Sequence, residues 1–244
     1  MDLGYKSHIG KVRTVNQDAY LILNDVHVKI FAVADGLGGH NAGEIASNML
    51  LNRLRKFFSE ETLLYHQQLH QEKIIQIIKK INEEIYHMGL GDPKLTGMGT
   101  TLTMTIFSEN CLYLFHVGDS RTYIINEKEI LQLTKDHSLV EQLVLQGEIT
   151  EEEAQSHPNK NILTRAIGTD LNIEIDYYTY SVKSNDKILL CTDGLTNLLN
   201  IDTIKDIVNK NSCQESADLL VEKANALGGY DNITLIVFYP EVKR

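Results

Sequence analysis

The sequence predicts an α+β fold in which antiparallel β-sheet is layered with helices on both outer sides. Strand-like apolar runs are joined by gaps as short as residues 108–110 and 126–128, which suit hairpins rather than helical crossovers. Helical periodicity occurs in two pairs, one between the early strands and one before the last strand. The 244 residues include no linker-like or low-complexity stretch, so we expect a single domain over residues 1–244.

The expected strands are short runs rich in branched aliphatic and aromatic residues. Such runs, bounded by Gly, Asn, Asp and Ser, are typical of strands that are buried on one or both faces. They cover residues 19–23, 28–34, 100–107, 111–117, 122–125, 173–180, 187–191 and 233–239.

The expected helices carry apolar residues at spacings of three and four. Gly89 is expected to stop the second of them, and Ser212 with Glu215 forms a capping box that begins the last. The long stripes cover residues 45–57, 74–88 and 217–224, and a shorter helix is expected over 202–208.

Residues 136–167 differ in pattern from the rest of the chain. A short apolar helical face is followed by Gly147, by a second capping box at Thr150 and Glu153, and by a polar stretch. We expect this segment to be a helical flap that lies over the sheet near an active site.

Composition argues against several kinds of partner. The net charge of −10 disfavours nucleic acid and anionic membranes. No stretch approaches the roughly 20 apolar residues of a membrane span, and no apolar leader is visible. The three cysteines, Cys111, Cys191 and Cys213, lack a CxxC pattern, which is typical of a reducing compartment. We therefore expect a cytoplasmic protein, and a monomer by default.

Four separated islands each set one acid against glycine or small polar residues. Asp35 stands in VADGLGGH, Asp119 in HVGDSR, Asp193 in LLCTDGL and Asp231 in GGYDNIT. Each island alone is compatible with an ordinary turn. Together, acids at strand ends indicate a shared pocket, where they would repel one another unless a cation neutralised them. Oxygen ligands of this kind suit Mg²⁺, Mn²⁺ or Ca²⁺.

Residues near these islands have types that suit phosphate chemistry. The glycines of DGLGGH allow close backbone approach, so the Gly36 carbonyl could reach a cation held by Asp35. His40 then stands near the start of the first long helix. Arg13 is of the residue type that binds phosphate in a bidentate manner. A glycine-rich turn with a surface histidine and an exposed arginine fit the same residues, and both interpretations stay open at this point.

Taken in order, the motifs resemble the PPM/PP2C family of metal-dependent serine/threonine phosphatases, and most closely its short bacterial members. The resemblance runs from Arg13 to Phe238, nearly the whole chain. It implies a four-layer αββα sandwich of two antiparallel β-sheets flanked by helix pairs, and the strand and helix order is compatible with that fold. The motifs are VRTVNQD, VADGLGGHNAGEIAS, GTTLT, HVGDSR, LTKDHS, TRAIG, CTDGL and DNIT.

The resemblance also implies a set of metal ligands. Asp35 would bridge two ions, and the Gly36 carbonyl would bind one of them. Asp193 and Asp231 would complete the second site, while Asp119 with Asp193 would hold a third, weaker ion. The implied cofactors are two to three Mn²⁺ or Mg²⁺ ions.

Three further residues take roles from the resemblance. Arg13 would hold the substrate phosphate, and His40 would be the general acid that protonates the leaving alkoxide. Asp18 would orient a water bound to the metal. Where many family members have a glutamate before this aspartate, this chain has Gln17.

The implied reaction is hydrolysis of phosphoserine and phosphothreonine, with some phosphotyrosine, in proteins. It proceeds by direct attack of a metal-bridging hydroxide, because two ions can clamp a phosphoryl group and activate water. The implied partners are phosphorylated proteins, including a cognate Hanks-type serine/threonine kinase and its substrates. No cysteine stands in a Cys-x5-Arg loop, which counts against cysteine-based phosphatase chemistry.

Two alternatives belong to other functional classes. A non-catalytic domain that binds Ca²⁺ or Mg²⁺ structurally predicts missing ligands or no phosphate-binding arginine, and neither is seen. A two-metal hydrolase for nucleotides or phosphodiesters would usually need a basic groove or a stacking platform. This chain is acidic and has no Trp.

Overall fold

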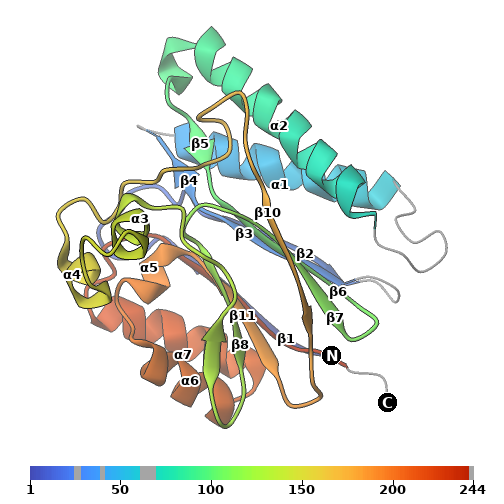
Figure 1. Ribbon diagram of the computed structural model, residues 1–244. Helices are drawn as coiled ribbons and strands as arrows, with labels where there is room; N and C mark the ends of the chain where they lie inside the picture. Colours follow the sequence, from blue (N-terminus) through green and yellow to red (C-terminus); the bar gives the residue numbers. More distant parts are fainter. Residues whose placement is uncertain (25–28, 39–41, 61–69, 242–244) are drawn as a thin grey trace.

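Two five-stranded antiparallel sheets pack face to face, and helices cover both outer faces, giving four layers (Figure 1). The structure is a computed structural model and describes residues 1–24, 29–38, 42–60 and 70–241. The predicted α+β sandwich of two sheets flanked by helices is confirmed.

The first sheet has the strand order β10-β7-β6-β3-β2. Neighbouring β6 and β7 form a tight hairpin around Glu109 and Asn110, which both adopt positive φ angles of 50° and 64°. The bounds of its strands are β2 Ala19–Asn24, β3 Lys29–Ala34, β6 Leu102–Ser108, β7 Cys111–Val117 and β10 Asp176–Ser181.

The second sheet has the order β1-β12-β11-β8-β9, so the two ends of the chain meet in one sheet. Two short strands, β4 (Gly36–Leu37) and β5 (Gly99–Thr100), pair separately beside the first sheet. The bounds in the second sheet are β1 Asp2–His8, β8 Arg121–Ile125, β9 Ile130–Gln132, β11 Lys187–Cys191 and β12 Ile233–Tyr239.

Helices form one layer on each sheet and one excursion between β9 and β10. The long pair α1 (Ala42–Glu60) and α2 (Gln71–Gly91) covers the first sheet, with the short helix η1 (Pro93–Leu95) after it. The second sheet is covered by α5 (Asp193–Thr196), α6 (Ile201–Lys210) and α7 (Cys213–Ala226). The excursion contains α3 (Leu139–Leu145) and α4 (Glu151–Ser156).

Strand periodicity separates the layers. In β3, Phe31 and Val33 face the space between the sheets, while Ala32 and Ala34 face α1 and α2. This follows from alternation, because successive side chains of a strand point to opposite faces. The Phe31 ring stacks on Phe238 of the opposite sheet with centroids 4.3 Å apart. A buried core thus joins the sheets to each other as well as to their helices.

Several predicted elements are confirmed with shifted bounds. The predicted strands over 111–117, 187–191 and 233–239 agree with β7, β11 and β12. Both predicted capping boxes are present, at Thr150 with Glu153 and at Ser212 with Glu215. The predicted strand over 173–180 was wrong at its start, since β10 begins at Asp176.

Three features differ from the sequence-based expectation. Strands β1 and β9 were not predicted, because their residues show no apolar alternation. The stop at Gly89 was wrong, since α2 continues to Gly91. A Cβ at Gly89 would lie 3.3 Å from the Leu95 carbonyl oxygen, so this glycine lets the helix pass close to the following turn.

Among the described residues, no helix is long and apolar enough to cross a membrane. The segment predicted as a flap holds two short helices within mostly irregular chain. The bridge between Ser138 and Leu163 joins the two ends of this segment to each other, and the bridge between Thr100 and Ile167 joins the segment to β5.

Candidate active site

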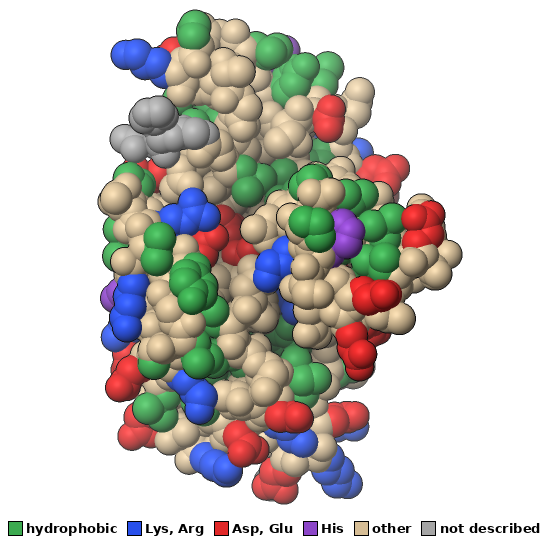
Figure 2. All heavy atoms as spheres, turned by 90° about the vertical axis from the view of Figure 1, so that its left-hand side faces the viewer, with side chains coloured by type: hydrophobic (Ala, Val, Ile, Leu, Met, Phe, Trp, Pro, Cys, Tyr) green, Lys and Arg blue, Asp and Glu red, His purple; other side chains and the backbone are tan. Residues whose placement is uncertain are grey.

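The four predicted acids lie at strand ends where the loops of the two sheets meet. Asp35 follows β3 and Asp119 follows β7, both in the first sheet, while Asp193 follows β11 and Asp231 precedes β12 in the second. Figure 2 shows acidic side chains gathered in a hollow of this face, with basic and hydrophobic side chains around it. The structure therefore brings together residues that are far apart in sequence.

Asp35 is fixed through its backbone by the GTT segment. Its amide donates to Thr101 Oγ1 at 2.9 Å, and its carbonyl accepts from the Thr101 amide at 2.8 Å and from Thr100 Oγ1 at 2.9 Å. Gly36 has no room for a side chain, because a Cβ would lie 2.2 Å from the Gly43 carbonyl oxygen. The start of α1 is thus pressed against the Asp35–Gly36 turn.

Asp119 is placed by the same threonine. Gly118 adopts φ +112°, and a Cβ there would lie 2.5 Å from the Thr101 side chain. Thr101 Oγ1 also shares a hydrogen bond of 2.9 Å with Ser120 Oγ. Thr101 therefore holds the loops that carry Asp35 and Asp119 next to each other.

Asp193 and Asp231 are brought together by backbone contact. A Cβ at Gly194 would lie 1.9 Å from the Asn232 carbonyl oxygen, so only glycine lets these turns touch. Asp193 Oδ2 accepts from Asn197 Nδ2 at 2.9 Å. Its other oxygen, Oδ1, is buried and has no hydrogen-bond partner.

Asp18 lies deeper than the other acids and is only 7% exposed. Its Oδ2 accepts from Thr192 Oγ1 at 2.9 Å, and its Oδ1 is buried without a partner. Burial, only partly offset by this hydrogen bond, raises the pKa of Asp18 to about 7. Asp18 is therefore hydrogen-bonded to the residue that precedes Asp193 in the chain.

The acids perturb one another electrostatically. Burial and then the neighbouring carboxylates raise the pKa of Asp35 and of Asp119 well above the usual range. Burial and then Asp231 raise the pKa of Asp193, and the hydrogen bond from Asn197 offsets this rise only in part. Mutual repulsion of this size is a feature of functional sites more often than of structural ones.

Arg13 supplies positive charge at the edge of this cluster. Its Nη2 donates to Asp231 Oδ2 at 2.8 Å, and half of its side chain remains exposed. That hydrogen bond raises the pKa of Arg13 above its ordinary value. The guanidinium therefore binds the carboxylate cluster through one nitrogen, and its other N–H groups remain available to bind an anion.

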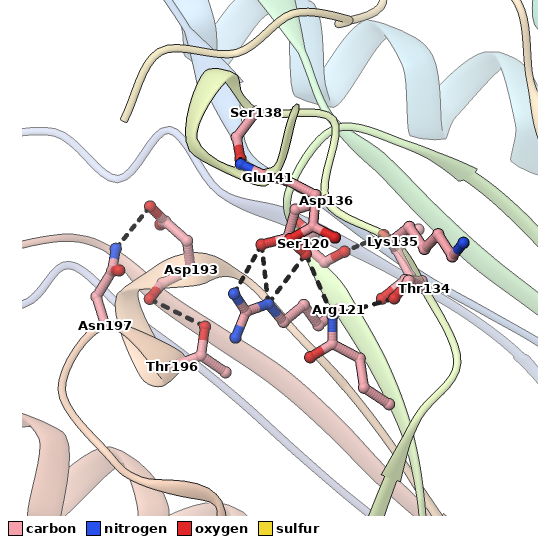
Figure 3. Close-up of polar contacts among 12 residues, drawn as sticks. Ser120, Arg121, Thr134, Lys135, Asp136, Ser138, Glu141, Asp193, Thr196 and Asn197 are labelled. Atoms are coloured by element: carbon pink, nitrogen blue, oxygen red, sulfur yellow. Dashed lines mark hydrogen bonds and ion pairs between the residues drawn. The ribbon is translucent and has the colours of Figure 1, made fainter. Parts of the chain in front are cut away.

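A second arginine, Arg121, lies close to the carboxylate cluster (Figure 3). The Arg121 guanidinium binds Asp136 with two oxygen contacts, Nη2 to Oδ2 at 2.7 Å and Nε to Oδ1 at 3.0 Å. Figure 3 shows this pair beside Asp193 and Asn197. Because Arg121 is already paired with Asp136, it adds a fixed positive field to the site rather than a free anion-binding group.

The donor set fits hard divalent cations. Unpartnered buried oxygens on Asp18 and Asp193, together with carboxylates that repel one another, are what a bound cation would relieve. Within the described part of the chain, no three His, Cys, Asp or Glu side chains are gathered closely enough to hold an ion as they stand. Arg13 on Asp231 and Asn197 on Asp193 occupy two of the oxygens. A cation bound at these two oxygens would replace these contacts.

Of the predicted site residues, His40 lies outside the described residues. Asp35, Gly36, Asp119, Asp193 and Asp231 are brought together, with Arg13 and Asp18 adjoining them. Sequence reasoning missed the residues that hold this set in place, such as Thr101 and Asn232. The only signal for them was their position inside the GTTLT and DNIT motifs.

Comparisons with known proteins identify relatives of this chain. A sequence model of protein phosphatase 2C matches residues 6–227. The chain is 38% identical over 239 residues to the serine/threonine phosphatase stp of Listeria welshimeri, covering 97% of this chain and 95% of that protein.

Solved structures show the same likeness. The serine/threonine phosphatase Stp1 from Staphylococcus aureus superimposes with a TM-score of 0.92 at 35% identity, covering 99% of this chain and 96% of that one. The catalytic domain of the serine threonine protein phosphatase PstP, solved in complex with 2 manganese ions, gives a TM-score of 0.84 at 34% identity, covering 96% of each chain.

Proposed function

Because this chain belongs to the protein phosphatase 2C family, we propose that it hydrolyses phosphoserine and phosphothreonine in proteins with the help of divalent metal ions. The observation that carries the proposal is the convergence of four carboxylates from both sheets beside Arg13. A single domain over residues 1–244 would supply every residue of the reaction.

The ligands we propose for the ions are Asp35, the Gly36 carbonyl, Asp193 and Asp231. Asp119 would join Asp193 at a third position, so the chain would use two to three Mn²⁺ or Mg²⁺ ions. When bound, such ions neutralise the carboxylates and the phosphoryl charge and lower the pKa of water. A family relative solved with two manganese ions supports this choice of cation.

Other residues would act on the substrate and on water. Arg13 would bind phosphoryl oxygens through its exposed donors, where negative charge accumulates in phosphoryl transfer. The unpartnered Oδ1 of Asp18 would accept a hydrogen bond from water in the site and orient it. We assign His40 the role of proton donor to the leaving serine or threonine oxygen, on the family resemblance.

The proposed partners follow from this chemistry. The substrates would be phosphorylated proteins, with a cognate serine/threonine kinase and its targets among them. The buried Cys191 and Cys213 are free thiols, which supports a reducing, cytoplasmic location. We further propose that the protein acts as a monomer.

Phosphate release from a phosphothreonine peptide tests the proposal. We expect release with Mn²⁺ and none with EDTA. Asp193→Asn is expected to lower kcat by at least about a hundredfold, because it removes one charged ligand from the cluster. Initial rates and the Mn²⁺ concentration for half-maximal activity are the measurements.

The matched control is Asp206→Asn, which changes an exposed carboxylate on α6 that pairs with Lys210. This variant is expected to keep wild-type rates. A folded wild-type protein that releases no phosphate with any divalent ion would contradict the proposal and favour the non-catalytic binding domain.

A further inference from the structure

Two exposed apolar side chains stand beside the arginine that we assign to phosphate binding. Val12 is 60% exposed and Tyr230 is 64% exposed. Val12 is the middle residue of segment 11–13, and Tyr230 is the middle residue of segment 229–231. Hydrogen bonds join the two segments before and after these middle residues. The Lys11 amide donates to the Gly229 carbonyl at 2.7 Å, and Arg13 Nη2 donates to Asp231 Oδ2 at 2.8 Å. Val12 and Tyr230 therefore border the Arg13–Asp231 pair, and we call them the Val12–Tyr230 surface.

The Tyr230 ring packs against the backbone of Gly228 although most of its surface is exposed. Gly228 has φ +128° and Gly229 has φ +53°, so the chain reaches Tyr230 through two consecutive left-handed glycines. A Cβ at Gly228 would lie 2.4 Å from Cζ of Tyr230 and 2.6 Å from its Cε2. The ring thus lies against bare glycine backbone. An aromatic surface that is already ordered loses little rotamer freedom when it binds a ligand.

Charge around the surface limits what it can accept. Asp231 follows Tyr230 directly, and Asp35 and Asp193 act on Arg13 from the cluster behind it. Lys11 lines a cavity beside α7, together with Lys6 and Asn225. An acidic group placed on the Val12–Tyr230 surface would therefore meet carboxylates on its inner side.

We propose that the Val12–Tyr230 surface binds the substrate residue next to the phosphorylated serine or threonine, and that it favours an apolar residue there. This inference rests on the proposed function, since it takes the phosphate to be held at Arg13. Neighbouring residues of an extended peptide are about 3.3–3.8 Å apart. A phosphate at Arg13 thus brings the adjacent side chain onto Val12 and Tyr230, where it buries apolar area.

A peptide series tests the inference. Phosphothreonine peptides would carry Leu, Gly, Asp or Lys at the positions before and after the phosphothreonine, and kcat and KM would be measured with Mn²⁺. We expect the wild-type protein to prefer Leu to Gly at one of these positions by about fivefold in kcat/KM, the size of one buried apolar contact. Tyr230→Ala should raise KM for the Leu peptide by a similar factor and remove the preference, with kcat unchanged.

Hydrolysis of p-nitrophenyl phosphate separates this inference from the proposed function. This substrate has no neighbouring residue, so Tyr230→Ala and Val12→Ser are expected to hydrolyse it at wild-type rates. Tyr230→Phe should keep the preference for Leu, because the ring is retained. Leu219→Ala, an exposed apolar position on α7, is the matched control and should change nothing.

Two results would overturn the inference while leaving the phosphatase assignment intact. One is equal kcat/KM for all peptides in an active wild-type protein. The other is a preference for Asp or Lys that survives in Tyr230→Ala. Failure of the folded wild-type protein to act on p-nitrophenyl phosphate and on every peptide would instead overturn the proposed function.

Discussion

Asn232 ties the amino-terminal segment to the carboxylate cluster. Its side chain is buried, and its Nδ2 donates to the Ile9 carbonyl at 2.9 Å and to the Val15 carbonyl at 3.0 Å. Its Oδ1 accepts from the Gln17 amide at 2.8 Å. Arg13 lies between these anchor points, so the position of its guanidinium depends on a side-chain amide that is 219 residues away in the chain.

Asn232→Ala is expected to displace Arg13 and to leave buried backbone groups without partners. We expect KM for a phosphothreonine peptide to rise about tenfold. The free energy of unfolding should fall by about 1–3 kcal/mol, the cost of an unsatisfied buried polar group. Steady-state kinetics and urea denaturation are the measurements.

Asn209→Ala is the matched control for this change. Asn209 also uses a part-buried amide to bind a backbone carbonyl, that of Asn126, but it lies on α6. It should lower stability without raising KM. An equal rise of KM in both variants would show that general destabilisation, and not the placement of Arg13, is responsible.

The sequence allowed the acids of the site to be predicted but not the residues that fix them. Asp35 and Asp193 follow apolar runs and precede glycine, and that pattern is visible locally. The structural role of Asn232 depends on hydrogen bonds to three backbone groups in residues 9–17, which come close to it only in the folded chain. Thr101 is missed for the same reason, since its partners are Asp35 and Ser120.

The predicted flap is attached to the first sheet through His137. Its amide donates to the Gly118 carbonyl at 2.8 Å, and its Nδ1 accepts from the Gly118 amide at 3.0 Å. A backbone amide only donates, so the neutral ring carries its proton on Nε2, which faces Asp176 Oδ2 at 3.3 Å. Burial and then Arg165 lower the pKa of His137, which favours this neutral form. Gly118 precedes Asp119, so the flap and a proposed metal ligand share one contact.

Substitution of His137 by Asn or by Gln tests the roles of its two ring nitrogens separately. Asn places its amide oxygen near the Nδ1 position and Gln places it near Nε2. We expect His137→Asn to keep a hydrogen bond to Gly118 and to need about the wild-type concentration of Mn²⁺. His137→Gln should need several times more Mn²⁺ for half-maximal activity, because the loop of Asp119 loses its anchor.

Equal Mn²⁺ requirements in the two His137 variants, with both folded, would show that the Nδ1 contact does not position the Asp119 loop. Circular dichroism and thermal unfolding serve as the folding control. Wild-type protein measured in parallel gives the reference Mn²⁺ concentration.

At the level of elements, predictability followed side-chain periodicity. The buried strands β7, β11 and β12 were predicted with their bounds because their apolar runs are continuous. The edge strand β1 was missed because its sequence, DLGYKSH, has no alternation and forms a strand only by pairing with β12. Its Gly4 packs against the Cys213 carbonyl at the start of α7, and no local sequence pattern predicts this contact.

Buried carboxylates make the stability of the whole metal-free molecule depend on pH. The pKa of Asp18 is raised to about 7, and the pKa values of Asp35 and Asp119 are raised well above their usual range. A group whose folded pKa is raised contributes stability that is lost as pH rises through that pKa. Buried His116, whose pKa is lowered to about 3, acts in the opposite direction, but only below about pH 6.5, the usual pKa of histidine.

Between pH 6.5 and 7.5 the carboxylate effect should therefore dominate, because the buried thiols Cys191 and Cys213, whose pKa values burial also raises, affect stability only at higher pH. We expect the melting temperature of EDTA-treated protein to fall over this range. With excess Mg²⁺ the fall should disappear, because bound cations stabilise the ionised carboxylates. Thermal unfolding at several pH values is the measurement.

Asp18→Asn is the variant that checks the source of the pH effect. Its metal-free melting temperature should depend less on pH between 6.5 and 7.5 than that of the wild-type protein. A slope equal to the wild-type slope would place the effect elsewhere in the molecule.

The proposed carboxylate ligands are shared equally between the two sheets, with Asp35 and Asp119 on one and Asp193 and Asp231 on the other. Ions bound among them would cross-link the halves of the sandwich at its open rim, where the apolar interior no longer does so. A lack of divalent metal would then lower the stability of the protein as well as its activity, and would make it more susceptible to proteolysis. The supply of metal in the cell would thus govern how long each copy survives.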